Sequence, residues 1–597
     1  MSSFNNSYLK TDRRSSMAER RPSNLSNYNK PFINIPQLAC LELPPPDYTP
    51  DNCDVLIIGT GLVESILAAA LAWQGSNVLH IDSNPYYGDT NSTLTIDQIK
   101  DWVKNNTSLG YKNFKNARLY IPRPTQLISK NYGIDLNQKL LFCKSDLLSL
   151  LLKSRVFKYL EFQSLSQFHT FENDNFEKII NSKQQIFVNN TLPLKIKRNL
   201  MKFLKFIINN NSNNIWFPYK KKPISLFLKE VFHLETAQIN EFIFAIGLCF
   251  SSNLNTPEAL QRIKRYIISF DVYGNFPVLY TKYGGPGEVS QGFCRSAAVA
   301  GTTYKLNTSL VAYDPIKKMA KLSDDSLITI NEKIVISPTQ IPNFLEEYQP
   351  KQKYEVSRLI TIVNSDCKEW MAENESACVV VFPENSLPSF NKYAVQVVIM
   401  GEGSEIVPKN QCAWFLSTIE RGSKGKIDLE SALSCLEQNL LRESKFNADD
   451  IGMEYIGIGN GNGMGYEMYN SLKLGSSLMN FVPEEKLTYL LKFYFTQKTS
   501  VPPFGVVNPK IFNEGENEHD NIIFNSMPSS ELSYDGVVTE AKVLYEKITG
   551  SDDDFFDIDF EDENENENEF GGNDYEYNSV LDDNAEMDEF YLDQDEY

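Results

Sequence analysis

The feature that most constrains the fold is a strand, turn, helix and strand unit that begins at Asp54. The run VLIIG is short and wholly apolar, which is typical of a buried strand, and helical spacing follows from Leu62 to Trp73. A second strand candidate, NVLHID, ends at Asp82. Because two strands joined through a helix normally lie parallel in one sheet, this unit predicts an α/β fold.

The turn between strand and helix carries most of a dinucleotide-binding motif. Gly59 and Gly61 stand where such a motif needs a tight turn and a close phosphate, and Asp82 stands where a carboxylate binds a ribose hydroxyl. The third glycine position is Glu64. Its bulk and charge oppose a diphosphate at the helix N-terminus, although an acid in the first turn also complements any helix dipole. We therefore expect a vacant nucleotide site that binds no FAD.

The chain divides into segments of different character. Residues 1–48 are polar and end in a proline-rich stretch, which predicts a disordered N-terminal extension. Residues 141–250 show helical spacing and several lysines, as in KIKRNLMKFLKFII, and are expected to form an all-helical domain II. Strand candidates such as KIVISP, ACVVVF and YAVQVVIM follow, so residues 49–140 and 251–548 are expected to form one discontinuous α/β domain I.

The acidity of the chain is concentrated at its C-terminal end. The formal net charge is -20, and the stretch from Ser551 to Tyr597 holds 21 Asp and Glu with no Lys or Arg, so the rest of the chain is near +1. We predict that residues 549–597 form an acidic disordered tail, which either aids solubility or deters nonspecific membrane and nucleic-acid contact. This balance gives no support to nucleic-acid binding.

Other sequence features favour a cytoplasmic protein without a metal. No run approaches the roughly eighteen apolar residues that a membrane span needs, and the N-terminus lacks the apolar core of a secretory signal. The nine cysteines form no C-x-x-C pair, and four histidines do not complete a zinc site. Scattered cysteines of this kind are typical of a reducing compartment.

Two sequence blocks resemble the family that contains Rab GDP-dissociation inhibitors and Rab escort proteins. They are DVLIIGTGLVESILAAALAWQGSNVLHIDSNPYYGD and RYIISFDVYGNFPVLYTKYGGPGEVSQGFCR, and the resemblance covers roughly residues 50–545. It implies a GDI-like, FAD-binding type of multi-layer α/β domain with a helical insert. The residues that carry it are Gly59, Gly61, Glu64, Asn84, Pro85, Tyr86, Gly88, Gly287, Glu288, Gln291, Gly292, Phe293 and Arg295.

Within this family three features favour an escort over an inhibitor. They are the long chain with its two tails, the form QGFCR of the second block, and the pair Phe187 and Arg198. The resemblance implies that this pair contacts the α subunit of a geranylgeranyl transferase, and an aromatic anchor beside an arginine suits a small interface. Alternatively, Phe187 is a core residue and Arg198 lies on a solvated helix face.

For a Rab-binding platform the resemblance implicates Tyr87, Glu258, Arg262 and Tyr273. Tyr87 would equally be a loop aromatic that packs on the sheet. Inhibitors commonly carry an arginine where this chain has Val272, so one platform contact is expected to be missing or altered.

The implied function is that of a non-catalytic accessory component of Rab geranylgeranyltransferase. Such a protein binds a new Rab GTPase, presents its C-terminal cysteines to the transferase α/β heterodimer, and carries the geranylgeranyl product to membranes, where it stays only transiently. An apolar cleft for the lipid is expected in the helical insert. The alternatives are a GDP-dissociation inhibitor that recycles prenylated Rabs and, more distantly, an FAD-dependent oxidoreductase, which would be yellow.

Overall fold

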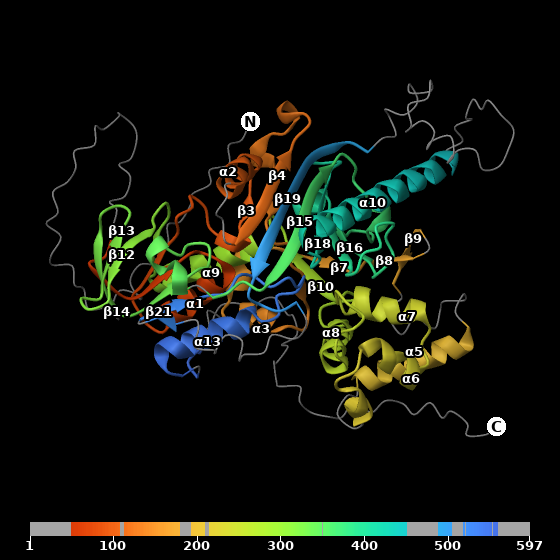
Figure 1. Ribbon diagram of the computed structural model, residues 1–597, viewed down its shortest axis with the longest axis horizontal. Helices are drawn as coiled ribbons and strands as arrows, with labels where there is room; N and C mark the ends of the chain where they lie inside the picture. Colours follow the sequence, from red (N-terminus) through yellow and green to blue (C-terminus); the bar gives the residue numbers. More distant parts are fainter. Residues whose placement is uncertain are drawn as a thin grey trace, which may run out of the picture. The chain divides into compact units, whose positions relative to one another are not determined.

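The computed structural model describes the chain from residue 49 to residue 558 with several gaps. The described residues are 49–107, 113–172, 174–179, 193–208, 214–348, 350–450, 487–503, 518–519, 521–551 and 553–558. The contacts divide the chain into Met1–Thr49 and Pro50–Tyr597, and every element below belongs to the second unit (Figure 1). The predicted N-terminal extension 1–48 and Phe187 lie outside the described residues.

The first sheet is built around the predicted unit. The elements β1 (Asn52–Ile58), α1 (Leu62–Trp73) and β2 (Val78–Ile81) confirm the prediction. Strand β1 lies between β2 and β14 (Leu327–Ile336) and is parallel to both. The order is β11-β2-β1-β14-β13-β12, with β21 also on β14 and β20 on β21. The remaining strands are β11 (Thr303–Lys305), β12 (Leu310–Asp314), β13 (Met319–Leu322), β20 (Glu518–His519) and β21 (Ile522–Phe524).

Helix α1 is buried along most of its length because two further helices pack against it. Its contacts are with α9 (Pro286–Ala300) and α13 (Val537–Thr549). A helix that is apolar on all sides needs such cover, and the small side chains of residues 68–70 allow a close approach. The N-terminus of α1 is thereby held at the carboxyl ends of β1 and β2.

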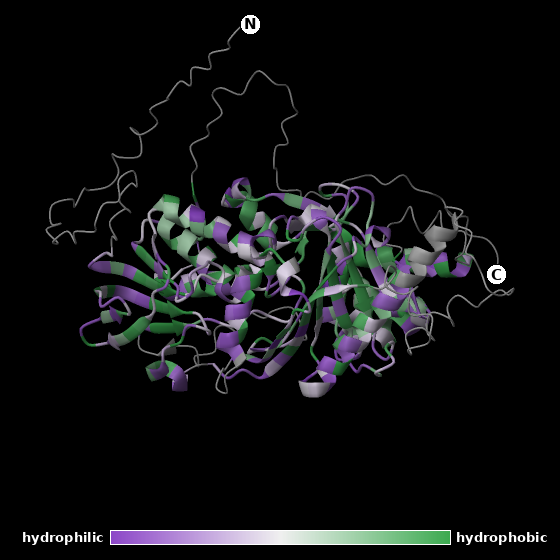
Figure 2. Ribbon diagram, turned by 90° about the horizontal axis from the view of Figure 1, so that it is seen from above, coloured by the Kyte–Doolittle hydropathy of each residue, from purple (hydrophilic) through white to green (hydrophobic). Residues whose placement is uncertain are grey.

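The second sheet has eight strands, in the order β4-β19-β15-β18-β17-β16-β8-β9. Their bounds are β4 (Phe114–Tyr120), β8 (Phe168–Glu172), β9 (Asn175–Lys178), β15 (Tyr354–Val363), β16 (Ala377–Phe382), β17 (Val395–Met400), β18 (Cys412–Thr418) and β19 (Tyr489–Thr499). Helix α10 (Gly422–Asp450) contacts β15, β17 and β18, and α2 (Ile96–Thr107) contacts β4. Strands β16 and β17 are buried along their whole length, and Figure 2 shows that hydrophobic residues gather on strands inside the molecule. Strands β14, β16 and β17 confirm the three strand candidates.

Short strands connect the larger layers. Strands β6 (Leu141–Phe142), β10 (Val278–Thr281) and β7 (Phe162–Leu165) form one small sheet. Strands β3 (Thr93–Leu94) and β5 (Ile134–Asp135) form another. Among the described residues, no helix is both long and apolar enough to cross a membrane.

The expectation that residues 141–250 are all-helical is wrong for their first part. Helix α3 (Asp146–Lys153) forms as expected, with Ser145 as its N-cap, but β7, β8 and β9 follow it. Strand β8 pairs in parallel with β16, which brings His169 opposite Val380. The helical spacing of LLSLLLK stops at Lys153, and the aromatic residues after it fit a strand that a distant part of the chain completes.

Among the described residues, the helical part begins at α5 and continues past residue 250. Its described helices are α5 (Leu194–Ile208), a 3-10 helix at Asn214–Tyr219, α6 (Ile224–Phe232), α7 (Thr236–Asn240), a π-helical turn at Glu241–Ile246, and α8 (Thr256–Ile268). Phe203 of α5 packs edge-on against Phe232 and Phe242. The same core cluster includes Phe415 and Phe493 of the second sheet, so helices and sheet share one core.

The predicted disorder of residues 549–597 is contradicted at the start of this segment. Residues 553–558 form an ordered turn in which Phe555 and Phe556 are buried among α1, α9 and α13. The ring of Phe556 meets that of Phe293 edge-on at 6.0 Å. The net charge of the segment predicts disorder, but two adjacent phenylalanines supply apolar area that outweighs it locally.

This contact predicts that the beginning of the acidic tail stabilises the fold. Replacing fully buried Phe556 by alanine (Phe556→Ala) should lower the free energy of unfolding by about 3–5 kcal/mol, because it removes the ring and leaves a cavity. The measurement is urea unfolding of the full chain.

Phe390→Ala is the matched control for this variant. Phe390 has nearly the same left-handed backbone (φ 54°, against 52° for Phe556), but its side chain is 77% exposed. Its replacement should change the free energy of unfolding by less than about 0.5 kcal/mol. Equal effects of the two substitutions would contradict the docking of Phe556.

Candidate functional site

The glycine turn after β1 has the geometry of a dinucleotide-binding loop. Gly59 has a left-handed φ of 99°, and a Cβ atom there would clash with Ser337 at the end of β14. Gly61 is the N-cap of α1. The backbone N–H groups of the first helical turn therefore point to where a phosphate is bound in proteins that carry such a cofactor.

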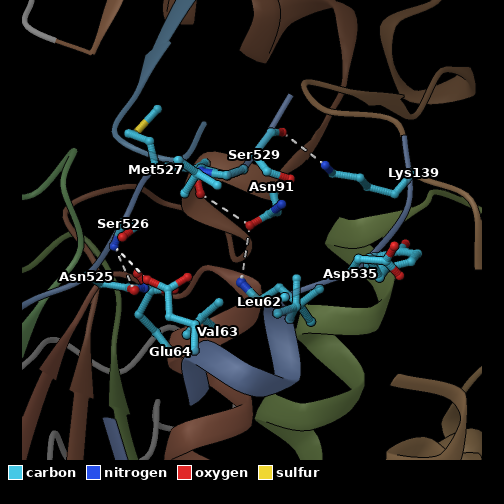
Figure 3. Close-up of a pocket in the computed structure, with 17 residues that line it drawn as sticks. Leu62, Val63, Glu64, Asn91, Lys139, Asn525, Ser526, Met527, Ser529 and Asp535 are labelled. Atoms are coloured by element: carbon cyan, nitrogen blue, oxygen red, sulfur yellow. Dashed lines mark hydrogen bonds between the residues drawn. The ribbon is translucent and has the colours of Figure 1, made fainter. Parts of the chain in front are cut away.

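The carboxyl group of Glu64 fills this position. A Cβ atom on Gly61 would lie 2.5 Å from Oε2 of Glu64, so the side chain folds back over the N-terminus of its own helix. Glu64 is 3% exposed and borders a cavity of about 40 Å³, lined also by Asn525, Ser526 and Glu540 (Figure 3). This volume suits about one water molecule, and it is far too small for a diphosphate.

Burial changes the protonation of this carboxyl group. Loss of water raises the pKa of Glu64 to about 8, and repulsion from Asp89 adds to the shift, while a hydrogen bond with Asn525 opposes it. Burial likewise raises the pKa of Glu540, which accepts a hydrogen bond from the backbone N–H of Ser526 at 2.9 Å, to about 8. Both groups are therefore largely neutral at pH 7, which lowers the cost of burying two acidic side chains in one site.

The acid that would bind a ribose is also engaged within the protein. Asp82 is fully buried and accepts hydrogen bonds from Thr60 N (2.8 Å), Thr60 Oγ1 (2.7 Å) and Asn84 N (2.8 Å). Gln340 donates a further bond to it at 2.9 Å. Burial, and then repulsion from Asp89, raises the pKa of Asp82 to about 7. The residues at this position do not fit FAD. The carboxyl group of Glu64 occupies the N-terminus of α1, where the diphosphate of FAD would bind, and Asp82 is engaged by Thr60 and Asn84 instead of a ribose.

The loop with the sequence NPYYG closes over the glycine turn. Gly88 has a φ of 102°, and its N–H donates to Oγ1 of Thr60 at 2.9 Å. Asn84 donates from its side chain to Asp82 at 2.9 Å, Pro85 is exposed, and Tyr86 is half-buried against the largest core cluster. The loop is thus bonded to the glycine turn and to Asp82, and its role here is structural.

The second block runs from the end of α8 through β10 into α9, and half of its signature residues on α9 serve packing. A Cβ atom on Gly287 would clash with Thr93, and one on Gly292 would lie 3.0 Å from Val156. Phe293 is fully buried. Of the remaining signature residues, Glu288 and Gln291 are half-buried and Arg295 is exposed. Burial raises the pKa of Glu288, and Arg295 opposes that shift.

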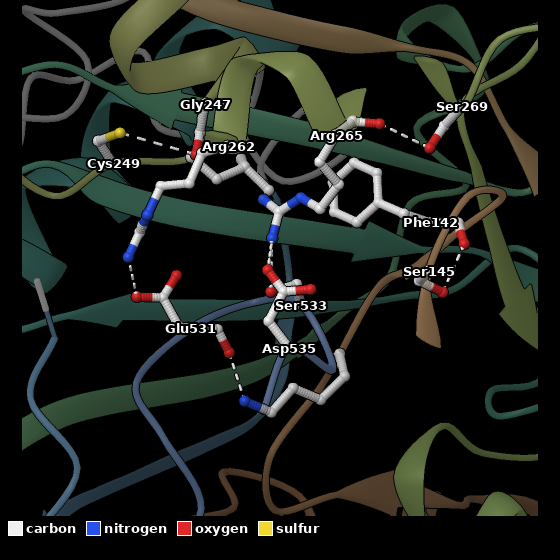
Figure 4. Close-up of polar contacts among 12 residues, drawn as sticks. Phe142, Ser145, Gly247, Cys249, Arg262, Arg265, Ser269, Glu531, Ser533 and Asp535 are labelled. Atoms are coloured by element: carbon white, nitrogen blue, oxygen red, sulfur yellow. Dashed lines mark hydrogen bonds and ion pairs between the residues drawn. The ribbon is translucent and has the colours of Figure 1, made fainter. Parts of the chain in front are cut away.

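Helix α8 carries a buried cationic side (Figure 4). Arg262 is 3% exposed and forms an ion pair with Glu531, which is 5% exposed. Arg265 pairs with Asp535, donates to Oγ of Ser533 at 2.8 Å, and lies 4.1 Å above the ring of Phe142. These two arginines, about one helical turn apart on α8, thereby hold the segment 531–535 in place. Sequence reasoning missed Glu531 and Asp535; the only signal was the arginine pair at a three-residue spacing.

The four predicted platform residues are not equivalent in the structure. Glu258 is half-buried on α8, and Tyr273 is 51% exposed shortly after it. Arg262 is enclosed by its ion pair, so it is not an exposed contact and instead positions the chain beside α8. Tyr87 is half-buried and packs edge-on against Tyr304 at 5.8 Å, as its alternative interpretation expects.

A cleft of about 220 Å³ opens beside this charged side of α8. Gln261, Arg262 and Arg265 line it together with the start of α3 and the start of α13. The exposed Val272 and Tyr273 follow α8 in the chain after three intervening residues. On the helical part, Arg198 is exposed on α5.

The buried carboxyl group predicts a pH dependence of stability. The folded pKa of Glu64, about 8, lies above its ordinary value of 4.5, so its contribution is complete below about pH 4.5 and is lost as the pH rises through about 8. Glu64→Gln should therefore reduce the fall in the free energy of unfolding over this window, by up to about 1.4 kcal/mol per pH unit.

Urea unfolding at a series of pH values measures this slope, and the exposed Glu369→Gln is the control. If wild type and Glu64→Gln have parallel pH profiles, the carboxyl group is not neutral in the fold.

Comparison with known proteins identifies the family of this chain. The family model "GDP dissociation inhibitor" matches residues 49–451. Rab proteins geranylgeranyltransferase component A of Saccharomyces cerevisiae is 52% identical over 97% of this chain and 98% of that protein. The protein of the same name from Candida albicans is 50% identical over 86% of each.

A solved structure shows the same fold. The crystal structure of Rab GDI from Plasmodium falciparum has a TM-score of 0.58 to this chain at 19% identity, and covers 84% of this chain and 99% of that one. The family model spans more than half of the sequence, and the two yeast relatives span most of it. The chain therefore belongs to the GDP dissociation inhibitor family.

Proposed function

We propose that this chain is a Rab escort protein, the accessory component A of a Rab geranylgeranyltransferase. The observation that carries the proposal is its 52% identity, over 97% of its length, to a protein named as that component. The filled dinucleotide position supports it, because an oxidoreductase of this fold would need that place for its cofactor. The chain supplies binding surfaces, and the transferase supplies catalysis.

The mechanism is one of tethering. A Rab GTPase carries its reactive cysteines on a flexible tail, which a transferase binds weakly when the tail is free. If one surface of the escort binds the folded GTPase and another binds the transferase, the tail meets the active site at an effective concentration in the millimolar range. The rate then depends on the two docking surfaces, and the escort itself contributes no catalytic residue.

After transfer the escort also shields the lipid. Exposing a geranylgeranyl group to water costs on the order of 10 kcal/mol, so a carrier needs an apolar cleft. We place it among α5, α6 and α8, where aromatic side chains such as Phe203 and Phe227 gather between helices. Helices that pack through side chains alone separate at lower cost than strands of one sheet, because no backbone hydrogen bonds break. The escort would work in the cytoplasm and touch membranes only to deliver its cargo.

A GDP-dissociation inhibitor is the second candidate, and the family match and the fold of Rab GDI favour it. It would bind prenylated Rabs as an escort does, but it would not bind the transferase. Transferase binding therefore separates the two candidates.

For the GTPase surface, Tyr273 is the residue to test. It is 51% exposed and follows α8 by five residues in the chain, and large aromatic residues carry much of the energy of small interfaces. Tyr273→Ala should weaken binding of a full-length Rab at least about tenfold in a titration. Tyr120→Ala, at a tyrosine that is 61% exposed on β4, should leave the affinity unchanged; equal affinities for both variants would remove Tyr273 from the platform.

For the transferase surface, Arg198 and Phe187 are the residues to test together. The double variant Phe187→Ala, Arg198→Ala should reduce the affinity for the purified transferase by at least about tenfold while Rab binding persists. Lys104→Ala on α2, which removes another exposed cation, is the control. Unchanged transferase binding would place the docking surface elsewhere.

A further inference from the structure

The outward face of α5 is a continuous basic stripe. Lys195, Arg198, Lys202 and Lys205 are all exposed. They follow one another at spacings of three, four and three residues, which places them on one side of a helix. The opposite side is apolar and packs into the core through Leu200, Phe203, Leu204 and Ile207.

The stripe belongs to a stretch of strongly unbalanced charge. Residues 193–229 contain nine Lys and Arg and no Asp or Glu. None of the ion pairs among the described residues involves the four side chains of the stripe. Like charges at these spacings repel each other along a helix, so the stripe does not stabilise α5. An anionic partner would relieve the repulsion.

An apolar edge runs beside the stripe. Leu194 is 83% exposed, Met201 is half-buried and Ile208 is 41% exposed, and the three recur every seven residues. A seven-residue repeat returns to nearly the same side of a helix. A basic face with exposed apolar side chains along it is characteristic of helices that lie at a membrane surface, where lysine stems follow the lipid boundary and their charges meet the headgroups. An acidic protein surface would not require the exposed leucine.

We propose that the outward face of α5 binds anionic phospholipid bilayers. The basic stripe contacts the headgroups, and Leu194 and Ile208 enter the outer layer of the membrane. Because Arg198 lies on the same face, a membrane and a transferase that docks there exclude one another; this second step rests on the proposed function. Arrival at an anionic membrane would then displace the transferase.

The test is co-sedimentation of the full chain with vesicles, in the absence of Rab and transferase. Phosphatidylcholine vesicles are compared with vesicles that also contain phosphatidylserine. The chain should bind the anionic vesicles, release them as the salt concentration rises, and bind the neutral vesicles much more weakly. The variant Lys202→Glu, Lys205→Glu should bind the anionic vesicles at least about tenfold more weakly.

A matched control removes the effect of overall charge. Lys100→Glu, Lys104→Glu makes the same change in net charge on α2, at two lysines one turn apart whose side chains are 40% and 75% exposed. It should bind vesicles as the wild type does, and circular dichroism should show unchanged helix content in both variants. Equal loss in the two variants would mean a nonspecific charge effect and would overturn the proposal.

The remaining outcomes also decide. If the wild type ignores anionic vesicles while Lys202→Glu, Lys205→Glu loses transferase binding, the stripe recognises an acidic protein surface and the membrane proposal is wrong. If vesicle binding occurs as expected but no transferase binding is found, the membrane proposal stands and the escort function fails.

Discussion

The structure depends on how the carboxyl ends of β1, β2 and β14 are closed. In a parallel sheet of this type these ends form the place where a ligand is normally bound. Here Glu64 covers the N-terminus of α1, and Asp82 binds Thr60 and Asn84. Asp89 accepts hydrogen bonds from the hydroxyl groups of Ser337 and Thr339. Internal carboxyl groups, whose pKa values are all raised by burial, thus join the strand ends that a cofactor would otherwise bridge.

Because the cofactor position is filled, we expect the function of the chain to depend on its exposed surfaces. The second block of signature residues holds α9 against α1 and β3, and the buried arginines of α8 hold the segment 531–535. Between them these contacts fix the position of the exposed residues after α8. The helical part shares its core with the second sheet. Helix α5 is therefore held by its apolar side, and its basic side is exposed. The residues of the family signature therefore belong largely to the scaffold, whereas Tyr273 and Arg198, which we propose for docking, are exposed on its surface.

Local sequence signals predicted the elements whose partners are near in the chain. The apolar run VLII, the glycines and the acid at Asp82 were sufficient for β1, α1 and β2, and the glutamate at position 64 indicated that the motif was altered. Strands β7 to β9 could not be predicted in the same way, because β8 is completed by β16, about two hundred residues later. The burial of Arg262 depends on Glu531, 269 residues away, and no local pattern distinguishes it from an exposed arginine. The burial of Phe555 and Phe556 could not be predicted, because the acidic residues around them indicate a disordered segment.

We propose that this chain makes a Rab GTPase a substrate without taking part in the chemistry. The most direct measurement is transfer of labelled geranylgeranyl to a full-length Rab by purified transferase, with and without this chain. Transfer should require the chain, and the chain without the transferase should transfer nothing. Equal transfer in its absence, together with extraction of prenylated Rab from membranes in its presence, would contradict the account and identify an inhibitor.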